Sequence, residues 1–312
     1  MAGLTGLVLV AVATTAVLDA LDRRRVPAPG DLVELADGRR LHLHVMGPDG
    51  AVATGRADRP TVVLEAGSSG FAASMAWLHR ALAEHTTGVA YDLHEALRRQ
   101  GLPGPYVLVG HSLGGAYVRV FAARHADEVV ALALLDPVHE EQLARLPAEA
   151  TEQLEQAQQQ LAIAPLLARL GTFRLIDVQG DIVAALPEDA GEQHRARSVT
   201  AAGMRAYGRE VAVLPDLLDD IARAEDARGA GVFGGLPVLI ITATEAGDGE
   251  TPEAREEMDA MHRELAARAP AASHATVTGA DHLSLITDPD HAQQIAAAVV
   301  ELLDELGDDA VP

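Results

Sequence analysis

The stretch VLVGHSLGG, residues 107–115, begins as an unbroken apolar run and ends in glycines, with Ser112 between the two parts. An apolar run without a polar face is typical of a strand that is buried on both sides of a parallel sheet. Residues 113–124 then follow with helical apolar spacing. The chain must therefore turn sharply at Ser112, and Gly110 and Gly114 stand at the two positions where a side chain would clash.

A serine at such a turn has its hydroxyl exposed above the sheet, at the N-terminus of the following helix. Peptide dipoles at a helix N-terminus favour a developing negative charge. Ser112 is therefore a candidate nucleophile, and the backbone N–H of Leu113 is a candidate donor to the oxyanion. The competing interpretation is a glycine-rich turn that holds an incidental serine.

Predicted strands and helices alternate before this motif. Residues 31–46 contain two alternating apolar segments around Asp37-Gly38, which predict a β-hairpin. Residues 61–65 read as a buried strand and residues 73–84 as a helix. This alternation predicts an α/β fold with a mostly parallel central sheet flanked by helices.

Residues 87–101, TGVAYDLHEALRRQG, allow two interpretations. In the first, residues 88–92 form a strand that a short helix follows. In the second, the whole stretch is one helix, which would leave a gap beside the nucleophile strand and expose its buried edge. We favour the strand.

With these motifs the chain resembles the α/β-hydrolase superfamily, and in particular its actinobacterial-type serine hydrolases. Those members read VVLEAG before the oxyanion loop and GPYVLVGHSLGG at the nucleophile, as this chain does. The resemblance extends over about residues 31–303 and includes LALLDPVHEEQ and GADHLSL. It implies a serine esterase-like enzyme that acts on a small-molecule ester and needs no metal or organic cofactor. Epoxide hydrolases and dehalogenases of this fold carry aspartate at the position of Ser112, so the resemblance disfavours both.

The base and the second oxyanion donor have candidates elsewhere in the chain. A serine hydroxyl is a poor nucleophile until a base takes its proton. His282, in VTGADHLSL, stands on a late loop where the superfamily places that base. In the loop AGSSG, Gly67 and Ser68 resemble the family's oxyanion loop, and the N–H of Ser68 is the favoured donor. His111 and His139 also lie near strand ends, and we interpret them as neighbours of the site.

Two strand ends offer the carboxylate that would orient His282. The superfamily more often places this acid after the strand in PVLIITATEAGDGE, but the usual position holds Ala246, with Asp248 two residues beyond. Some members use the end of the strand that follows the nucleophile helix, which here is Asp136 in VVALALLD. We favour Asp136 and keep Asp248 as the alternative acid. An aspartate at a strand end can also serve only to cap the following turn.

Residues 140–235 show helical apolar spacing without visible alternation of strands and helices. An insertion at this point of the fold predicts a helical cap over the active site, with residues 31–139 and 236–312 as the α/β-hydrolase core. We expect five apolar residues of the cap to supply the substrate pocket: Leu161, Leu166, Leu167, Phe173 and Leu175.

The N-terminal segment differs from the rest of the chain. Residues 1–18 carry no charged side chain and are followed by Arg23, Arg24 and Arg25. An uncharged run of this length is at the short edge of a membrane span of ~20 residues. We expect residues 1–30 to be an apolar anchor or signal segment plus a linker, with membrane association through residues 1–21, and a helix docked on the domain is the third interpretation. The protein would then be membrane-anchored or secreted.

Composition narrows the classes of partner. The formal net charge is -22, and so negative a surface would repel nucleic acid. The absence of cysteine excludes disulfides, thiolate metal sites and a cysteine nucleophile.

The sequence therefore predicts a capped α/β-hydrolase that cleaves carboxylic esters through an acyl-enzyme. One alternative is a proline-iminopeptidase-like peptidase, which needs acidic side chains to hold a free amine. Another is a weakly active hydrolase-fold protein that binds a small apolar ligand. Relative to the family, the chain lacks a long loop after AYD, so we expect an open site with loose substrate selectivity and low turnover on small esters.

Overall fold

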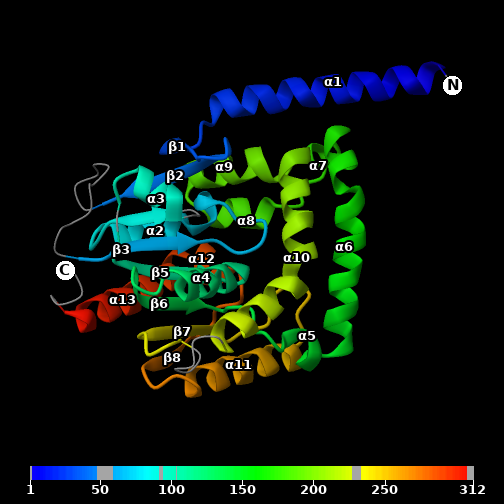
Figure 1. The fold of residues 1–312 in the computed structure, drawn as a ribbon. Coiled ribbons are helices and arrows are strands. Elements are labelled where there is room, and N and C mark those ends of the chain that lie inside the picture. Colours follow the sequence, from blue (N-terminus) through cyan, green and yellow to red (C-terminus); the bar gives the residue numbers. More distant parts are fainter. Residues whose placement is uncertain (1, 48–58, 91–93, 103, 227–232, 308–312) are drawn as a thin grey trace.

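A computed structural model describes residues 2–47, 59–90, 94–102, 104–226 and 233–307 (Figure 1). Within these residues one eight-stranded sheet has the strand order β1-β2-β4-β3-β5-β6-β7-β8. The strands are β1 (Asp31–Glu34), β2 (Arg40–Met46), β3 (Thr61–Glu65), β4 (Gly88–Ala90), β5 (Tyr106–His111), β6 (Val129–Leu135), β7 (Val238–Ala243) and β8 (Ala272–Val277).

The neighbouring strands β4, β3, β5, β6, β7 and β8 pair in parallel, in this order across the sheet. At one edge β1 and β2 form an antiparallel hairpin. The hairpin prediction is confirmed, because Asp37 and Gly38 lie between β1 and β2 and Gly38 has a φ of 80°. The strand interpretation of the ambiguous segment is also confirmed over Gly88–Ala90, which pairs with β3 on one side and β2 on the other. Tyr91 and Asp92 lie outside the described residues.

Both faces of the sheet are covered by helices. On one face α2 (Ala76–Ala83), α12 (Ser284–Thr287) and α13 (Pro289–Leu306) pack against side chains such as Val107 and Val109. On the other face α3 (His94–Arg99), α4 (Leu113–Arg124) and α11 (Pro252–Ala267) enclose a cluster that includes Leu108. Successive side chains of a strand point to opposite faces, so burial of both faces explains why β5 is apolar without alternation.

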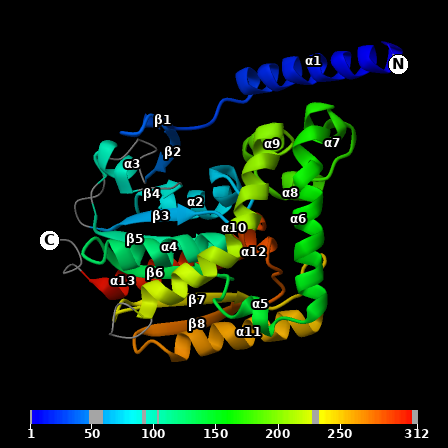
Figure 2. The ribbon, with the colours of Figure 1, turned by 45° about the vertical axis from the view of Figure 1, so that its right-hand side comes forward.

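Between β6 and β7 the described residues form six helices: α5 (Gln142–Arg145), α6 (Ala148–Arg169), α7 (Thr172–Leu175), α8 (Gly180–Ala185), α9 (Glu188–Ser198) and α10 (Ala201–Asp226). They gather at one end of the sheet, and the long helices α6 and α10 run side by side (Figures 1 and 2). An apolar cluster joins α10 to α4 through Leu218, Ile221 and Ala116. These helices therefore stand over the end of the sheet at which Ser112 lies.

Helix α1 (Ala2–Arg25) lies apart from the sheet, across the tip formed by α6 and α7 (Figures 1 and 2). Over Thr5–Arg25 it is long and apolar enough to cross a membrane, and it is the one helix of the described residues that meets this test. Its contacts with the tip include ion pairs from Arg174 to Asp19 and Asp22 at 2.6 and 2.7 Å.

Candidate active site

The turn at Ser112 has the geometry that the sequence predicts. Ser112 has a φ of 55°, in the left-handed region that non-glycine residues rarely adopt, and it immediately precedes α4. A Cβ on Gly110 would lie 2.5 Å from the carbonyl oxygen of Gly114, and a Cβ on Gly114 would lie 2.5 Å from that of Glu65. The prediction that both flanking positions require glycine is confirmed.

His282 and Asp136 form the closest polar pair of the site. The Nδ1 atom of His282 lies 2.6 Å from Oδ2 of Asp136, which is only 2% exposed. Ser112, His282 and Asp136 all line one cavity of about 840 Å³. With Nδ1–H donating to the carboxylate, the other ring nitrogen of His282 is left as the proton acceptor. The structure thus brings together three residues that the sequence nominates from separate segments.

Asp136 has further partners that fix it. Arg255 on α11 donates from Nη1 to the same Oδ2 atom at 2.8 Å, and the backbone N–H of Ala243 donates to Oδ1 at 3.2 Å. Burial opposes ionisation, but the hydrogen bond from His282 and the charge of Arg255 outweigh it and hold the pKa of Asp136 well below its usual range. Asp136 is therefore a carboxylate at neutral pH.

The alternative acid, Asp248, has a different environment. It is exposed on the loop after β7 and lines the same cavity. Among the described residues, the carboxylate that hydrogen-bonds Nδ1 of His282 is Asp136. The geometry therefore favours Asp136 over Asp248 as the orienting acid.

The loop after β3 approaches Ser112 closely. A Cβ on Gly67 would lie 2.8 Å from the Cβ of Ser112, so only glycine allows this approach. Gly67 and Ser68 line the main cavity, and Ser68 and Leu113 also line an adjoining hollow of about 330 Å³. The next residue, Ser69, donates its N–H to the Glu210 carboxylate on α10 at 2.8 Å. The three proposed oxyanion positions are therefore grouped around Ser112.

His111 supports the loop that carries His282. Its Nε2–H donates to the backbone carbonyl of His282 at 2.8 Å, and the two ring centroids are 4.7 Å apart. Burial lowers the pKa of His111 to about 3, so the ring is neutral and serves as a fixed donor. His139 is also buried, and its backbone N–H donates to Oε1 of Gln142, a residue that lines the cavity. His111 lines the cavity and His139 contacts a residue that lines it, so both are neighbours of the site.

Within residues 140–235, the side chains that line the cavity differ from those expected. Of the five apolar residues named from the sequence, none is among the described residues that line it. Leu161 and Phe173 pack instead around a small cluster of α6 and α10 residues, and Leu166 and Leu175 are exposed. Helical periodicity identifies an apolar side chain but not the neighbour that it faces, which explains the error. The residues of this stretch that line the cavity are Gln142, Leu146, Ala150, Gln153, Gln179, Asp181, Ile182, Ala185, His194 and Tyr207.

Arg255 and His194 are contributors that the sequence analysis missed. His194 lies between two cavity residues: its Nε2 is 2.8 Å from Oε1 of Gln179, and its Nδ1 is 3.3 Å from Oγ of Ser74. Arg255 lies in a helix of mixed charge and reaches Asp136 across more than a hundred residues of chain. No local motif surrounds either residue, so only the folded arrangement reveals them.

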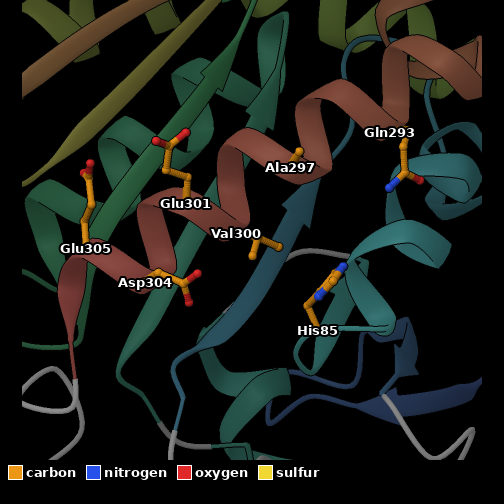
Figure 3. Close-up of a pocket in the computed structure, with 7 residues that line it drawn as sticks. All are labelled: His85, Gln293, Ala297, Val300, Glu301, Asp304 and Glu305. Atoms are coloured by element: carbon orange, nitrogen blue, oxygen red, sulfur yellow. The ribbon is translucent and has the colours of Figure 1, made fainter.

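The described residues contain no group of three His, Asp or Glu side chains arranged to hold a metal ion. A hollow of about 530 Å³ along α13 carries Glu301, Asp304 and Glu305, with His85 on its other side (Figure 3). The carboxylates of Glu301 and Glu305 point away from His85 (Figure 3), and Asp304 pairs with Arg59 at 2.8 Å. This hollow shares no residue with the cavity at Ser112.

Comparison with known sequences agrees with this architecture. Residues 68–174 match the family model described as alpha/beta hydrolase fold. Over 63 residues the chain is 43% identical to an uncharacterized protein of Schizosaccharomyces pombe. That match covers 20% of this chain and 12% of the yeast protein.

Three solved structures illustrate the similarity of fold. An ancestral haloalkane dehalogenase has a TM-score of 0.66 at 18% identity, over 88% of this chain and 99% of that one. A haloalkane dehalogenase loop variant from Bradyrhizobium elkanii has a TM-score of 0.66 at 17% identity, over 90% of this chain and 98% of that one. A thermophilic esterase from Thermogutta terrifontis has a TM-score of 0.57 at 19% identity, over 89% of this chain and 99% of that one. At these identities the likeness concerns the fold.

Proposed function

We propose that this chain, which belongs to the α/β-hydrolase superfamily, cleaves carboxylic esters through an acyl-enzyme on Ser112. The observation that carries the proposal is the constellation in one cavity: Ser112 at a strained strand-to-helix turn and the His282–Asp136 pair joined at 2.6 Å. A serine at this position supports ester cleavage over dehalogenation, because dehalogenases of this fold carry an aspartate at the position of Ser112.

The reaction follows from these positions. The unprotonated ring nitrogen of His282 takes the proton of the Ser112 hydroxyl as Oγ attacks the ester carbonyl. The negative charge that develops on the carbonyl oxygen is stabilised by the N–H groups of Leu113 and of Ser68 or Gly67. The imidazolium then protonates the departing alcohol, and the acyl group remains on Oγ. Water, deprotonated by His282, attacks the acyl group and releases the acid.

The helices from α5 to α10 act in this proposal as a cap, over residues 140–235, on a core of residues 31–139 and 236–312. Two contacts support a fixed placement of the cap: Trp77 donates from Nε1 to the carbonyl of Ala185 at 2.9 Å, and Arg80 pairs with Asp189 at 2.6 Å. The proposal also includes membrane association through residues 1–21, supported by the length and apolar character of α1.

A fluorophosphonate probe, which phosphonylates activated serines, tests the nucleophile. We expect the wild type to be labelled and Ser112→Ala to remain unlabelled. Ser68→Ala is the matched control, since it removes a hydroxyl in the same cavity but keeps the backbone N–H that the mechanism uses. Equal labelling of wild type and Ser112→Ala would rule out Ser112.

A panel of substrates separates ester cleavage from the alternatives. We expect p-nitrophenyl esters from acetate to decanoate to be cleaved, and aminoacyl p-nitroanilides with a free amine to be poor substrates. Faster cleavage of the anilides would favour the peptidase. Absence of both activities, together with absence of labelling, would favour a hydrolase-fold protein that only binds its ligand.

A further inference from the structure

The tip of the cap carries a concentration of exposed apolar side chains. Outside α1, the described part of the chain has eight exposed large apolar residues, and five of these lie between positions 163 and 178. They are Ile163 at 57%, Leu166 at 62%, Leu175 at 87%, Ile176 at 56% and Val178 at 49%. We call these five residues the cap-tip patch. Single exposed apolar residues are ordinary, but a concentration of them on or beside two helices that contact each other, as α6 and α7 do, indicates an interaction surface.

The cap-tip patch adjoins α1. The α6–α7 turn touches the middle of α1, because a Cβ on Gly171 would lie 2.7 Å from Oγ1 of Thr15. One residue before Leu175, Arg174 pairs with Asp19 and Asp22 near the end of α1. Both views show α7 and the adjoining end of α6 beneath α1 (Figures 1 and 2). The apolar helix and the apolar patch are thus attached to each other at the same end of the molecule.

We propose that the cap-tip patch contacts a phospholipid bilayer beside α1 and that the enzyme takes its ester substrate, an amphiphile with an apolar chain, from that bilayer. This inference rests on the proposed ester hydrolysis for its substrate and on α1 for its attachment to the membrane.

A bilayer fits this surface better than a soluble partner. The side chains of α1 from Leu7 to Leu21 are mostly exposed, and an apolar helix of this length is buried by lipid. Its contacts with Gly171 and Arg174 then bring the cap tip to the bilayer. The three consecutive arginines at residues 23–25 follow the apolar part of α1, as basic residues do at the end of a span. The net charge of -22 gives no attraction to anionic lipid, so the contact is apolar and suits zwitterionic phosphatidylcholine.

The cap-tip patch is continuous in sequence with the wall of the candidate site. Val178 is followed directly by Gln179, whose side chain lines the cavity and contacts His194. Ile182 and Ala185, on the next helix, line the same cavity. The acyl chain of a substrate that leaves the bilayer at the cap tip therefore meets cavity residues within one or two helical turns of the patch. This continuity favours long-chain esters held in lipid over short soluble ones.

Site-specific fluorescence tests the membrane contact without using activity. The chain has no cysteine, so Leu175→Cys gives a single labelling site at a side chain that is 87% exposed. With the full chain reconstituted in phosphatidylcholine vesicles, we expect a lipid carrying a quencher in its acyl chains to quench this label. Val213→Cys on α10, also exposed and apolar, is the matched control and should remain unquenched. A label at position 175 that is no better quenched than the control would overturn the proposal.

A second measurement links the patch to substrate delivery. The double variant Leu175→Glu/Ile176→Glu should cleave soluble p-nitrophenyl butyrate within about twofold of the wild-type rate, because neither residue lines the cavity. Its cleavage of p-nitrophenyl palmitate embedded in vesicles should fall about tenfold. Val213→Glu should affect neither substrate. Unchanged cleavage of the embedded ester by the double variant would refute the delivery role.

The outcomes separate this inference from the proposed function. If no variant cleaves any ester, the proposed function fails, while the quenching experiment still decides whether the patch contacts lipid. If the label at position 175 is shielded from water in the absence of vesicles and sedimentation shows a dimer, the patch binds a second copy of the chain and the bilayer proposal is wrong.

Discussion

The carboxyl edge of the sheet and the cap hold their cavity residues by different means. At the edge, Ser112 donates its N–H to the carbonyl of Leu135 and Asp136 donates to that of Ile241, at 2.9 and 2.7 Å. These bonds continue the sheet ladder, so both residues move only if the sheet does. The cap instead reaches the core near the 3-10 helix η1 (Ala72–Met75) and α2 through side chains, such as Ser74 with His194 and Arg80 with Asp189. We expect changes at the edge to affect chemistry and changes in the cap to affect substrate choice and local stability.

The largest effect is expected at the edge, where Asp136 and Asp248 can be compared directly. Asp136→Asn replaces the carboxylate that orients the ring of His282 and stabilises its imidazolium with a neutral amide, and kcat should fall about 10⁴-fold. Asp248→Asn, on an exposed loop of the same cavity, should stay within about threefold of wild type. Steady-state rates on p-nitrophenyl butyrate measure both. A near-normal rate for Asp136→Asn with a collapse in Asp248→Asn would reverse the assignment.

Arg255 offers a finer test of how the edge is tuned. Its guanidinium shares Oδ2 of Asp136 with His282, so it holds in place the carboxylate that orients the ring. Arg255→Gln removes the charge beside Asp136, and the carboxylate should then be held less firmly. The kcat on p-nitrophenyl butyrate should fall about tenfold. The loss of one partner from a buried ion pair should also lower the unfolding free energy by about 3 kcal/mol.

Arg255→Lys is the matched control, because it keeps a positive charge beside Asp136. It should keep kcat within about threefold of the wild-type value even if it loses some stability, since a lysine cannot reproduce the planar donor geometry. An unchanged kcat in both variants would mean that Arg255 acts only as a structural partner.

The sequence predicts the edge well because its constraints are local. The turn at Ser112 requires two flanking glycines, and a strand buried on both faces requires continuous apolar residues, so each leaves a recognisable pattern within a few positions. His282 and Asp136 stand at strand ends, where parallel topology brings separate loops to one edge. The choice between Asp136 and Asp248 stayed open because it depends on which loop reaches His282 in space.

The cap is less predictable for the complementary reason. Its helices are visible from apolar spacing, but Leu166 and Leu175 satisfy that spacing and are nonetheless exposed. Which apolar face points to the cavity is set by packing among helices and against α1, which no short motif encodes. The sequence did not identify Arg255 or His194 for the same reason, since each contacts a residue more than a hundred positions away in the chain.

The cap's role in substrate choice can be tested at Ile182, which lines the cavity from α8. Ile182→Trp adds bulk on that wall, so kcat/KM for the octanoate ester relative to acetate should fall about tenfold. Leu166→Trp is the matched control: its site is 62% exposed and lies outside the cavity, and the ratio should stay within about twofold. Equal effects of the two substitutions would mean that Ile182 does not contact the acyl chain.

The smallest effect concerns the contact between the cap and the core at His194. Burial lowers the pKa of His194 to about 4, whereas an unfolded histidine titrates at about 6.5. Between these values the unfolded chain binds more protons than the folded one, so the stability contributed by the neutral ring is lost as the pH falls through this window. His194→Gln keeps a partner for Gln179 without a titrating group, and should reduce the pH slope of the unfolding free energy by up to about 1.4 kcal/mol per unit. Urea unfolding at pH 7, 6 and 5 measures that slope. Ser74→Ala is the control, because it removes the hydroxyl but keeps the imidazole of His194. It should lower the unfolding free energy at every pH and leave its pH slope unchanged. Equal slopes in wild type and His194→Gln would show that this contact does not sense pH.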